Sequence, residues 1–118
     1  MDKKDLQISE LIDLSYRLWS KNKDKWSPME PEYGKEFILY MIEEIGEVIQ
    51  IIKKKREDKI MNNVEVRERF VEELGDVLMY YIDVLNRFDI SAEEFSKIYM
   101  KKFNENLTRN YEKQYKNF

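Results

Sequence analysis

Only three glycines and two prolines interrupt the 118-residue sequence. Because these two residue types are the main breakers of regular structure, long stretches of the chain can remain helical. Charged residues make up 38% of the sequence and apolar residues 42%. This balance is typical of long helices with charged outer faces and one apolar face. The sequence therefore predicts an all-α protein.

Four helices are predicted from the spacing of apolar residues and from the residues that start and end helices. The expected helices span about 5–21, 32–55, 64–88 and 91–113, with a proline-containing loop at 22–33, a turn at 58–63 and a short link at 89–90. Ser91 and Glu94 form a capping box at the start of the last helix. We expect one domain, residues 1–118, folded as a four-helix bundle with an antiparallel central hairpin.

The sequence contains no cysteine and no histidine. Zinc held by thiolates or imidazoles, a cysteine nucleophile and a histidine base are therefore excluded. The net charge of −3 argues against nucleic-acid binding. There is no secretory leader pattern and no apolar stretch long enough to span a membrane, so we expect a cytoplasmic protein. Its chemistry would depend on carboxylates or on a hard cation bound by oxygen.

Two pairs of acids lie where the expected helices should be apolar. On a helical wheel, Glu44 falls among apolar and aromatic residues of the second helix, and Glu47 lies at the border of that face. In the third helix, Glu73 lies inside the apolar arc and Asp76 follows one turn later. Asp83 and Arg87 continue the same stripe, and we expect them to form an ion pair within the bundle. Each acidic pair taken alone also fits a solvated helix face.

The two pairs should meet if the second and third helices form a hairpin around Ile60. Glu44 and Asp76 are each sixteen positions from Ile60, and Glu47 and Glu73 are each thirteen. Four carboxylates would then share one level of the bundle, where they would repel one another or take up protons. A divalent cation resolves that conflict, and oxygen ligands favour Mg²⁺, with Mn²⁺ as the next candidate.

Three short segments follow one another along the sequence. They are Glu43-Glu44-Ile45-Gly46-Glu47, Glu72-Glu73-Leu74-Gly75-Asp76 and Lys102-Phe103-Asn104-Glu105-Asn106-Leu107-Thr108-Arg109. They resemble the Glu-x-x-Glu, Glu-x-x-Asp and Lys-x-x-x-Asn-x-x-Arg/Lys segments of the MazG-like, all-alpha NTP pyrophosphohydrolases. The family's later Tyr-Pro element is absent, and the region before Phe37 matches less clearly, which leaves substrate choice open.

This resemblance implies Mg²⁺-dependent hydrolysis of a nucleoside triphosphate between its α- and β-phosphates. Glu44, Glu47, Glu73 and Asp76 would bind the metal. Glu47 is the first candidate for the base that takes the proton of the attacking water, and Glu43 is another.

Lys102, Asn106 and Arg109 share one face of the last expected helix. The resemblance implies that they bind the substrate, since cations suit phosphates and the amide suits the sugar or a phosphate. Lys102 and Arg109 could instead only extend past an apolar seam. Trp26 could stack on the base, although packing is the more common fate of a tryptophan.

Members of the family commonly assemble, so we expect a homodimer or homotetramer. Two alternatives stay open. One is a related pyrophosphohydrolase acting on another phosphoanhydride, either a nucleoside diphosphate or phosphoribosyl-ATP. The other is a non-catalytic helical module whose acidic stripes bind a basic protein partner.

Overall fold

The computed structural model describes residues 4–109, and within this range the regular structure is entirely helical. Four α-helices follow one another, with a single 3₁₀ turn, η1 (Pro31–Tyr33), before the second. The α-helices are α1 (Ile8–Lys21), α2 (Gly34–Asn62), α3 (Val64–Arg87) and α4 (Ala92–Thr108). The predicted all-α class with four helices is confirmed. No helix of residues 4–109 has both the length and the apolar composition needed to cross a bilayer.

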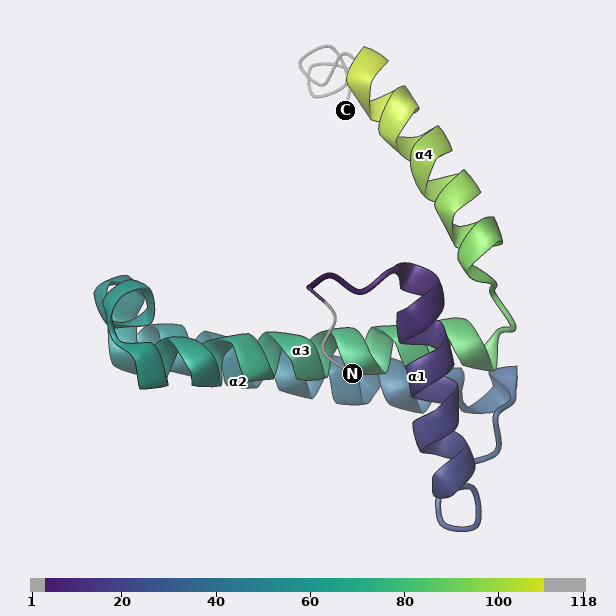
Figure 1. The fold of residues 1–118 in the computed structure, drawn as a ribbon, viewed down its shortest axis with the longest axis horizontal. Helices are drawn as coiled ribbons and strands as arrows, with labels where there is room; N and C mark the ends of the chain where they lie inside the picture. The colour runs from purple at the N-terminus through teal and green to yellow at the C-terminus, as the bar shows by residue number, and fades with distance from the viewer. Residues whose placement is uncertain (1–3, 110–118) are drawn as a thin grey trace.

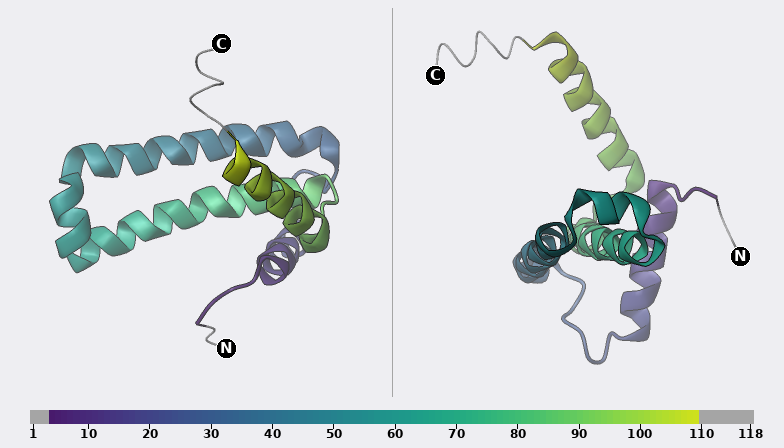
Figure 2. Two further views of the ribbon diagram at one scale, coloured as in Figure 1. Left: turned by 90° about the horizontal axis from the view of Figure 1, so that it is seen from above. Right: turned by 90° about the vertical axis from the view of Figure 1, so that its left-hand side faces the viewer.

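Helices α2 and α3 form the centre of the molecule. They lie side by side along most of their length and run in opposite directions (Figures 1 and 2). The buried apolar residues of the described chain all belong to this pair: Val48 and Ile60 from α2, and Ile82 and Leu85 from α3. Helix α1 crosses α3 near the C-terminal end of α3, where the Asn86 side chain donates a hydrogen bond to the Ile12 carbonyl at 3.1 Å. The hairpin is therefore the scaffold on which the other elements rest.

The link between α2 and α3 differs from the predicted turn. The helix bends at Arg56, whose φ of 66° and ψ of 162° lie in a region that favours glycine. Residues 57–62 are helical, although we predicted a turn at 58–63. The sequence there contains no glycine or proline, and Ile60 gains burial by facing the hairpin. Asn63 then caps α3, accepting a hydrogen bond from the Val66 amide at 3.0 Å.

Arg87 anchors the loop before α2 to the end of α3. Its side chain is fully enclosed, and its Nε donates to Asp83, so the predicted ion pair is confirmed. Its terminal nitrogen donates to the Pro28 carbonyl, and its guanidinium lies 3.7 Å from the centre of the Phe37 ring. Burial raises the pKa of Asp83, and Arg87 counters this by favouring the charged form. One buried cation thus connects three segments of the chain.

Helix α4 stands away from the hairpin (Figure 1). Its backbone approaches α1 but neither α2 nor α3, and its Phe95 ring meets Tyr81 at 6.1 Å. Further along α4, Ile98, Tyr99, Phe103 and Leu107 are 46–69% exposed. The predicted end of this helix near Lys113 lies outside the described residues. Within one chain, α4 therefore leaves its apolar face uncovered.

The Arg87 anchor yields a stability prediction. Arg87→Leu should lower the free energy of unfolding by about 3–5 kcal/mol, because Asp83 would be left buried without its cation. Arg69→Leu is the matched control, since Arg69 pairs with Glu73 at the same four-residue spacing but is 68% exposed. That change should cost about 0–1 kcal/mol. Urea unfolding measures both, and equal losses would contradict the proposed role of the buried pair.

Candidate metal centre

Three of the four predicted acids come together midway along the hairpin. One carboxylate oxygen each from Glu44 of α2 and from Glu73 and Asp76 of α3 lies within 4.8 Å of the others. Glu44 and Asp76 are half-buried, and the Glu73 side chain is 12% exposed. The helical period explains this grouping, because residues three or four positions apart share a face that points to the neighbouring helix. These three carboxylates are called the acidic cluster below.

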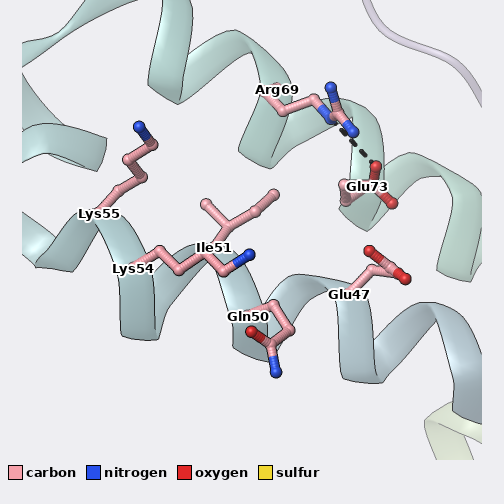
Figure 3. A pocket seen from close by; sticks show the side chains of 7 residues that line it. All are labelled: Glu47, Gln50, Ile51, Lys54, Lys55, Arg69 and Glu73. Atoms are coloured by element: carbon pink, nitrogen blue, oxygen red, sulfur yellow. Dashed lines mark hydrogen bonds and ion pairs between the residues drawn. The ribbon is translucent and has the colours of Figure 1, made fainter.

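Glu47 lies beside this cluster and not within the group of three. Its carboxylate points from α2 toward that of Glu73 on α3 (Figure 3), and both residues line one cavity. Glu47 and Glu43 are exposed. The structure therefore places Glu47 at the edge of the acidic cluster, with Glu43 exposed one turn earlier on the same helix.

Electrostatic repulsion within the acidic cluster changes the acidity of Glu44. Burial, a hydrogen bond with Glu73, and the charges of Asp76, Glu73 and Glu47 all raise the pKa of Glu44 above its ordinary value. A hydrogen bond between two carboxyl groups requires a proton on one of them. The cation-free cluster therefore has an unfavourable arrangement that a divalent cation would relieve, and its all-oxygen donors fit Mg²⁺ or Mn²⁺.

An aromatic group borders the acidic cluster on one side. The Phe37, Tyr40 and Tyr80 rings contact one another at centroid distances of 5.4–6.2 Å. Burial and then the negative charge of Glu44 raise the pKa of Tyr80, which shows how close that ring lies to the acids. The sequence pattern alone did not assign these residues to the site. Their helical spacing from Glu44 and Asp76 was the available signal, but aromatic residues at such positions are also typical of a core.

Basic residues border the cluster on the opposite side. Arg69 of α3 donates from Nε to Glu73 at 3.2 Å. Lys54 and Lys55 of α2 line the same cavity as Glu47 and Glu73 (Figure 3). Lys54 and Lys55 were not predicted as site residues, because a basic run at the end of a helix is already explained by the helix dipole. Arg69 was not predicted either.

The predicted substrate-binding residues do not join the acidic cluster within one chain. Lys102, Asn106 and Arg109 are carried by α4 or lie just beyond it, and the backbone of α4 does not approach that of α2 or α3. The side-chain oxygen of Asn106 is enclosed and lacks a hydrogen-bond partner among residues 4–109. Trp26 lies in the loop after α1, 40% exposed. Helical periodicity predicts that Lys102, Asn106 and Arg109 share one face, but it does not predict how α4 is oriented relative to the hairpin.

Comparison with known families agrees with this geometry. A model of the MazG nucleotide pyrophosphohydrolase domain matches residues 33–109. The chain belongs to the MazG family. The matched range contains the acidic cluster, Glu43, Glu47 and the three polar residues of the α4 region, but neither α1 nor Trp26. No curated protein and no solved structure gave a significant match. The family assignment therefore rests on the region that carries the acids.

The acidic cluster of this MazG-family protein leads to a prediction of how Mg²⁺ changes the free energy of unfolding. Mg²⁺ at one hundred times its dissociation constant should stabilise the wild type by about 2.7 kcal/mol. Glu44→Gln should lose most of this effect because it removes a ligand. Without Mg²⁺ the same variant should be at least as stable as the wild type, since it removes a repelling charge. Urea unfolding with Mg²⁺ or with chelator measures both differences.

The control is Glu72→Gln, which removes an exposed carboxylate next to Glu73 in sequence. It should keep the full response to Mg²⁺, and an equal loss in this variant would contradict the assignment.

The dependence of stability on pH has a defined sign. Because the folded-state pKa of Glu44 is raised, the cation-free protein loses stability as pH rises through that pKa. Stabilisation by Mg²⁺ should therefore increase with pH over the same range.

Proposed function

We propose that this MazG-family protein is a Mg²⁺-dependent hydrolase that cleaves an NTP or dNTP to the monophosphate and pyrophosphate. The observation that carries the proposal is the acidic cluster, whose three carboxylate oxygens lie within 4.8 Å of one another inside the family's matched region. When bound there, Mg²⁺ would supply charge neutralisation and Lewis acidity toward the phosphates. Glu44, Glu73 and Asp76 would hold it, with Glu47 as a further ligand.

The protein's own residues would then orient the substrate and move one proton. A water molecule would add to one of the two phosphorus atoms joined by the α–β bridge, and the bond from that phosphorus to the bridging oxygen would break. The products are the monophosphate and pyrophosphate. Glu47 would accept the proton of that water on a carboxylate oxygen, a role supported by its exposure and by its position beside Glu73 in the cavity. Glu43, exposed one turn earlier on α2, is the second candidate.

We further propose that the protein works as a homo-oligomer, with a dimer as the smallest unit. Its accessible surface is 10078 Å², whereas a compact monomer of 14.5 kDa exposes about 6,900 Å². Even if residues 1–3 and 110–118 are counted as fully extended, about 1,600 Å² of excess remains. A standard interface buries about 800 Å² per partner, so this excess is enough for a stable dimer.

A second copy also accounts for the position of α4. The uncovered apolar face of α4 and the exposed apolar residues of the hairpin would cover each other if α4 of one copy packed on the hairpin of another. Ile42, Ile45 and Ile49 of α2 are 40–56% exposed. If α4 packs on the partner's hairpin, Lys102, Asn106 and Arg109 can reach the partner's acidic cluster, and cations would then approach a negatively charged site.

Turnover tests the proposed reaction. With Mg²⁺ and a panel of nucleotides, the protein should release pyrophosphate from at least one NTP or dNTP. Glu44→Gln and Asp76→Asn should each lower kcat by about a hundredfold or more, because each weakens electrostatic stabilisation of the transition state. Glu72→Gln should retain activity, and circular dichroism should show equal helicity in all variants. Release of orthophosphate from the triphosphate, or full turnover in both acid variants, would contradict the proposal.

Mixed dimers test whether α4 acts on the partner's site. Glu44→Gln and Lys102→Met protomers, each weakly active alone, are refolded together in equal amounts. Half of the dimers should be mixed and should contain one intact site, which restores about a quarter of wild-type activity. If α4 serves its own chain, both protomers of a mixed dimer stay defective. Activity no higher than that of the parent variants would then reject the shared site.

A further inference from the structure

The chemical character of the hairpin changes in a fixed order along its length. On α2 the order is Tyr40, then Glu44 and Glu47, then Lys54 and Lys55. On α3, read in the opposite direction, it is Tyr80, then Asp76 and Glu73, then Arg69. The two helices are antiparallel neighbours (Figures 1 and 2). The two series coincide along them, because Tyr40 contacts Tyr80, Glu44 meets Asp76 and Glu73, and the two lysines line one cavity with Arg69. The acidic cluster thus has aromatic rings on one side and cations on the other.

A cavity of about 240 Å³ occupies the basic side. Glu47 and Glu73 form the end next to the acidic cluster, Ile51 contributes an apolar wall, and Lys54, Lys55 and Arg69 provide the positive charge (Figure 3). Its volume corresponds to about eight water molecules in the liquid, so it can hold a small ion with part of its hydration. A second cavity shares Ile51, Lys55 and Arg69 and continues toward the start of α3.

Only one of the three cations that line this cavity forms an ion pair within the described residues. Arg69 gives its Nε–H to Glu73, and within residues 4–109 its terminal nitrogens have no carboxylate partner. Lys54 and Lys55 form no ion pair in the same range. The Lys54 side chain extends back along α2 toward Gln50 (Figure 3), the direction in which helical side chains lean. Arg69 and Lys54 are therefore available to an anion that begins beside Glu47 and Glu73, and Lys55 stands at the far end of the same cavity (Figure 3).

We infer that this cavity binds the β- and γ-phosphates of the substrate, and hence the pyrophosphate product, through Lys54, Lys55 and Arg69. The inference rests on the proposed pyrophosphohydrolase function and adds the direction in which the nucleotide lies. A polyphosphate bound at the acidic cluster can extend toward the cations or toward the aromatic rings. Its most negatively charged end is stabilised at the cations, where Arg69 offers a planar fork and the lysines offer point charges. The nucleoside then lies toward Tyr40 and Tyr80.

Helix stabilisation is the competing explanation for the lysines. Cations in the last turn before the bend at Arg56 also interact favourably with the helix dipole. That explanation applies equally to Lys53, which is exposed and lines neither cavity. A comparison between cavity lysines and lysines outside the cavity therefore separates the two roles without changing the type of charge removed.

Calorimetry with inorganic pyrophosphate in Mg²⁺ tests the inference on the full-length protein. The wild type should bind pyrophosphate, and the double variant Lys54→Met/Lys55→Met should bind it about tenfold or more weakly. The control Lys53→Met/Lys59→Met removes the same two charges outside the cavity and should match the wild type. Binding of a nucleoside monophosphate should be the same in all three proteins, because its single phosphate stays at the acidic cluster. Stabilisation by Mg²⁺ should also be unchanged, which shows that the metal centre is intact.

Three results would overturn the inference. They are no pyrophosphate binding by the wild type, equal weakening in the two double variants, or weaker monophosphate binding with unchanged pyrophosphate binding. None of these readouts requires turnover. The proposed function has its own separate failure, which is the absence of pyrophosphate release from every nucleotide tested. A protein that hydrolyses nucleotides but binds pyrophosphate equally in all variants would thus refute only the orientation.

Discussion

Mutual repulsion among carboxylates on the α2–α3 hairpin is the constraint on which the proposed function depends. The helical period directs Glu44, Glu73 and Asp76 to the seam between two helices, where each also approaches the acids of the other helix. Apolar side chains at these positions would strengthen a core that, in the described chain, contains only four buried apolar residues. The sequence instead keeps acids that raise the pKa of Glu44. Such an arrangement is understandable where a cation is part of the working structure.

The buried Arg87 shows a different use of charge in the same hairpin. Its guanidinium satisfies Asp83, a loop carbonyl and the face of Phe37, so nearly all of its interactions are internal. Phe37 in turn contacts Tyr40 and Tyr80, the aromatic rings beside the acidic cluster. The anchor thus connects the position of the loop before α2 to one edge of the candidate site. Arg69, by contrast, stays largely exposed and keeps donors available to solvent or ligand.

The sequence predicted what depends on local periodicity. The four helices and the seam position of Glu44, Glu73 and Asp76 all follow from which residues recur every three or four positions. Counting from Ile60 predicted that Glu44 lies level with Asp76, and these two acids do lie together with Glu73. The bend at Arg56 and the helical segment after it were not predicted. The direction of α4 could not be predicted, because a four-residue link leaves the angle between two helices undetermined. The cavity lysines were missed because one physical explanation for them, the helix dipole, was already sufficient.

Helix α4 carries Lys102 and Asn106 away from the hairpin that carries the acidic cluster. Burial in the described chain is concentrated between α2 and α3, and the apolar faces of α4 and of the outer hairpin remain exposed. Apolar surface of this extent is costly in water, so the same force that would bring two copies together would also bring α4 to a partner's hairpin. Association and completion of the site would then be one event. Under that arrangement, the cations of α4 and those of the hairpin cavity approach the acidic cluster from different copies, and the bound polyphosphate would neutralise both.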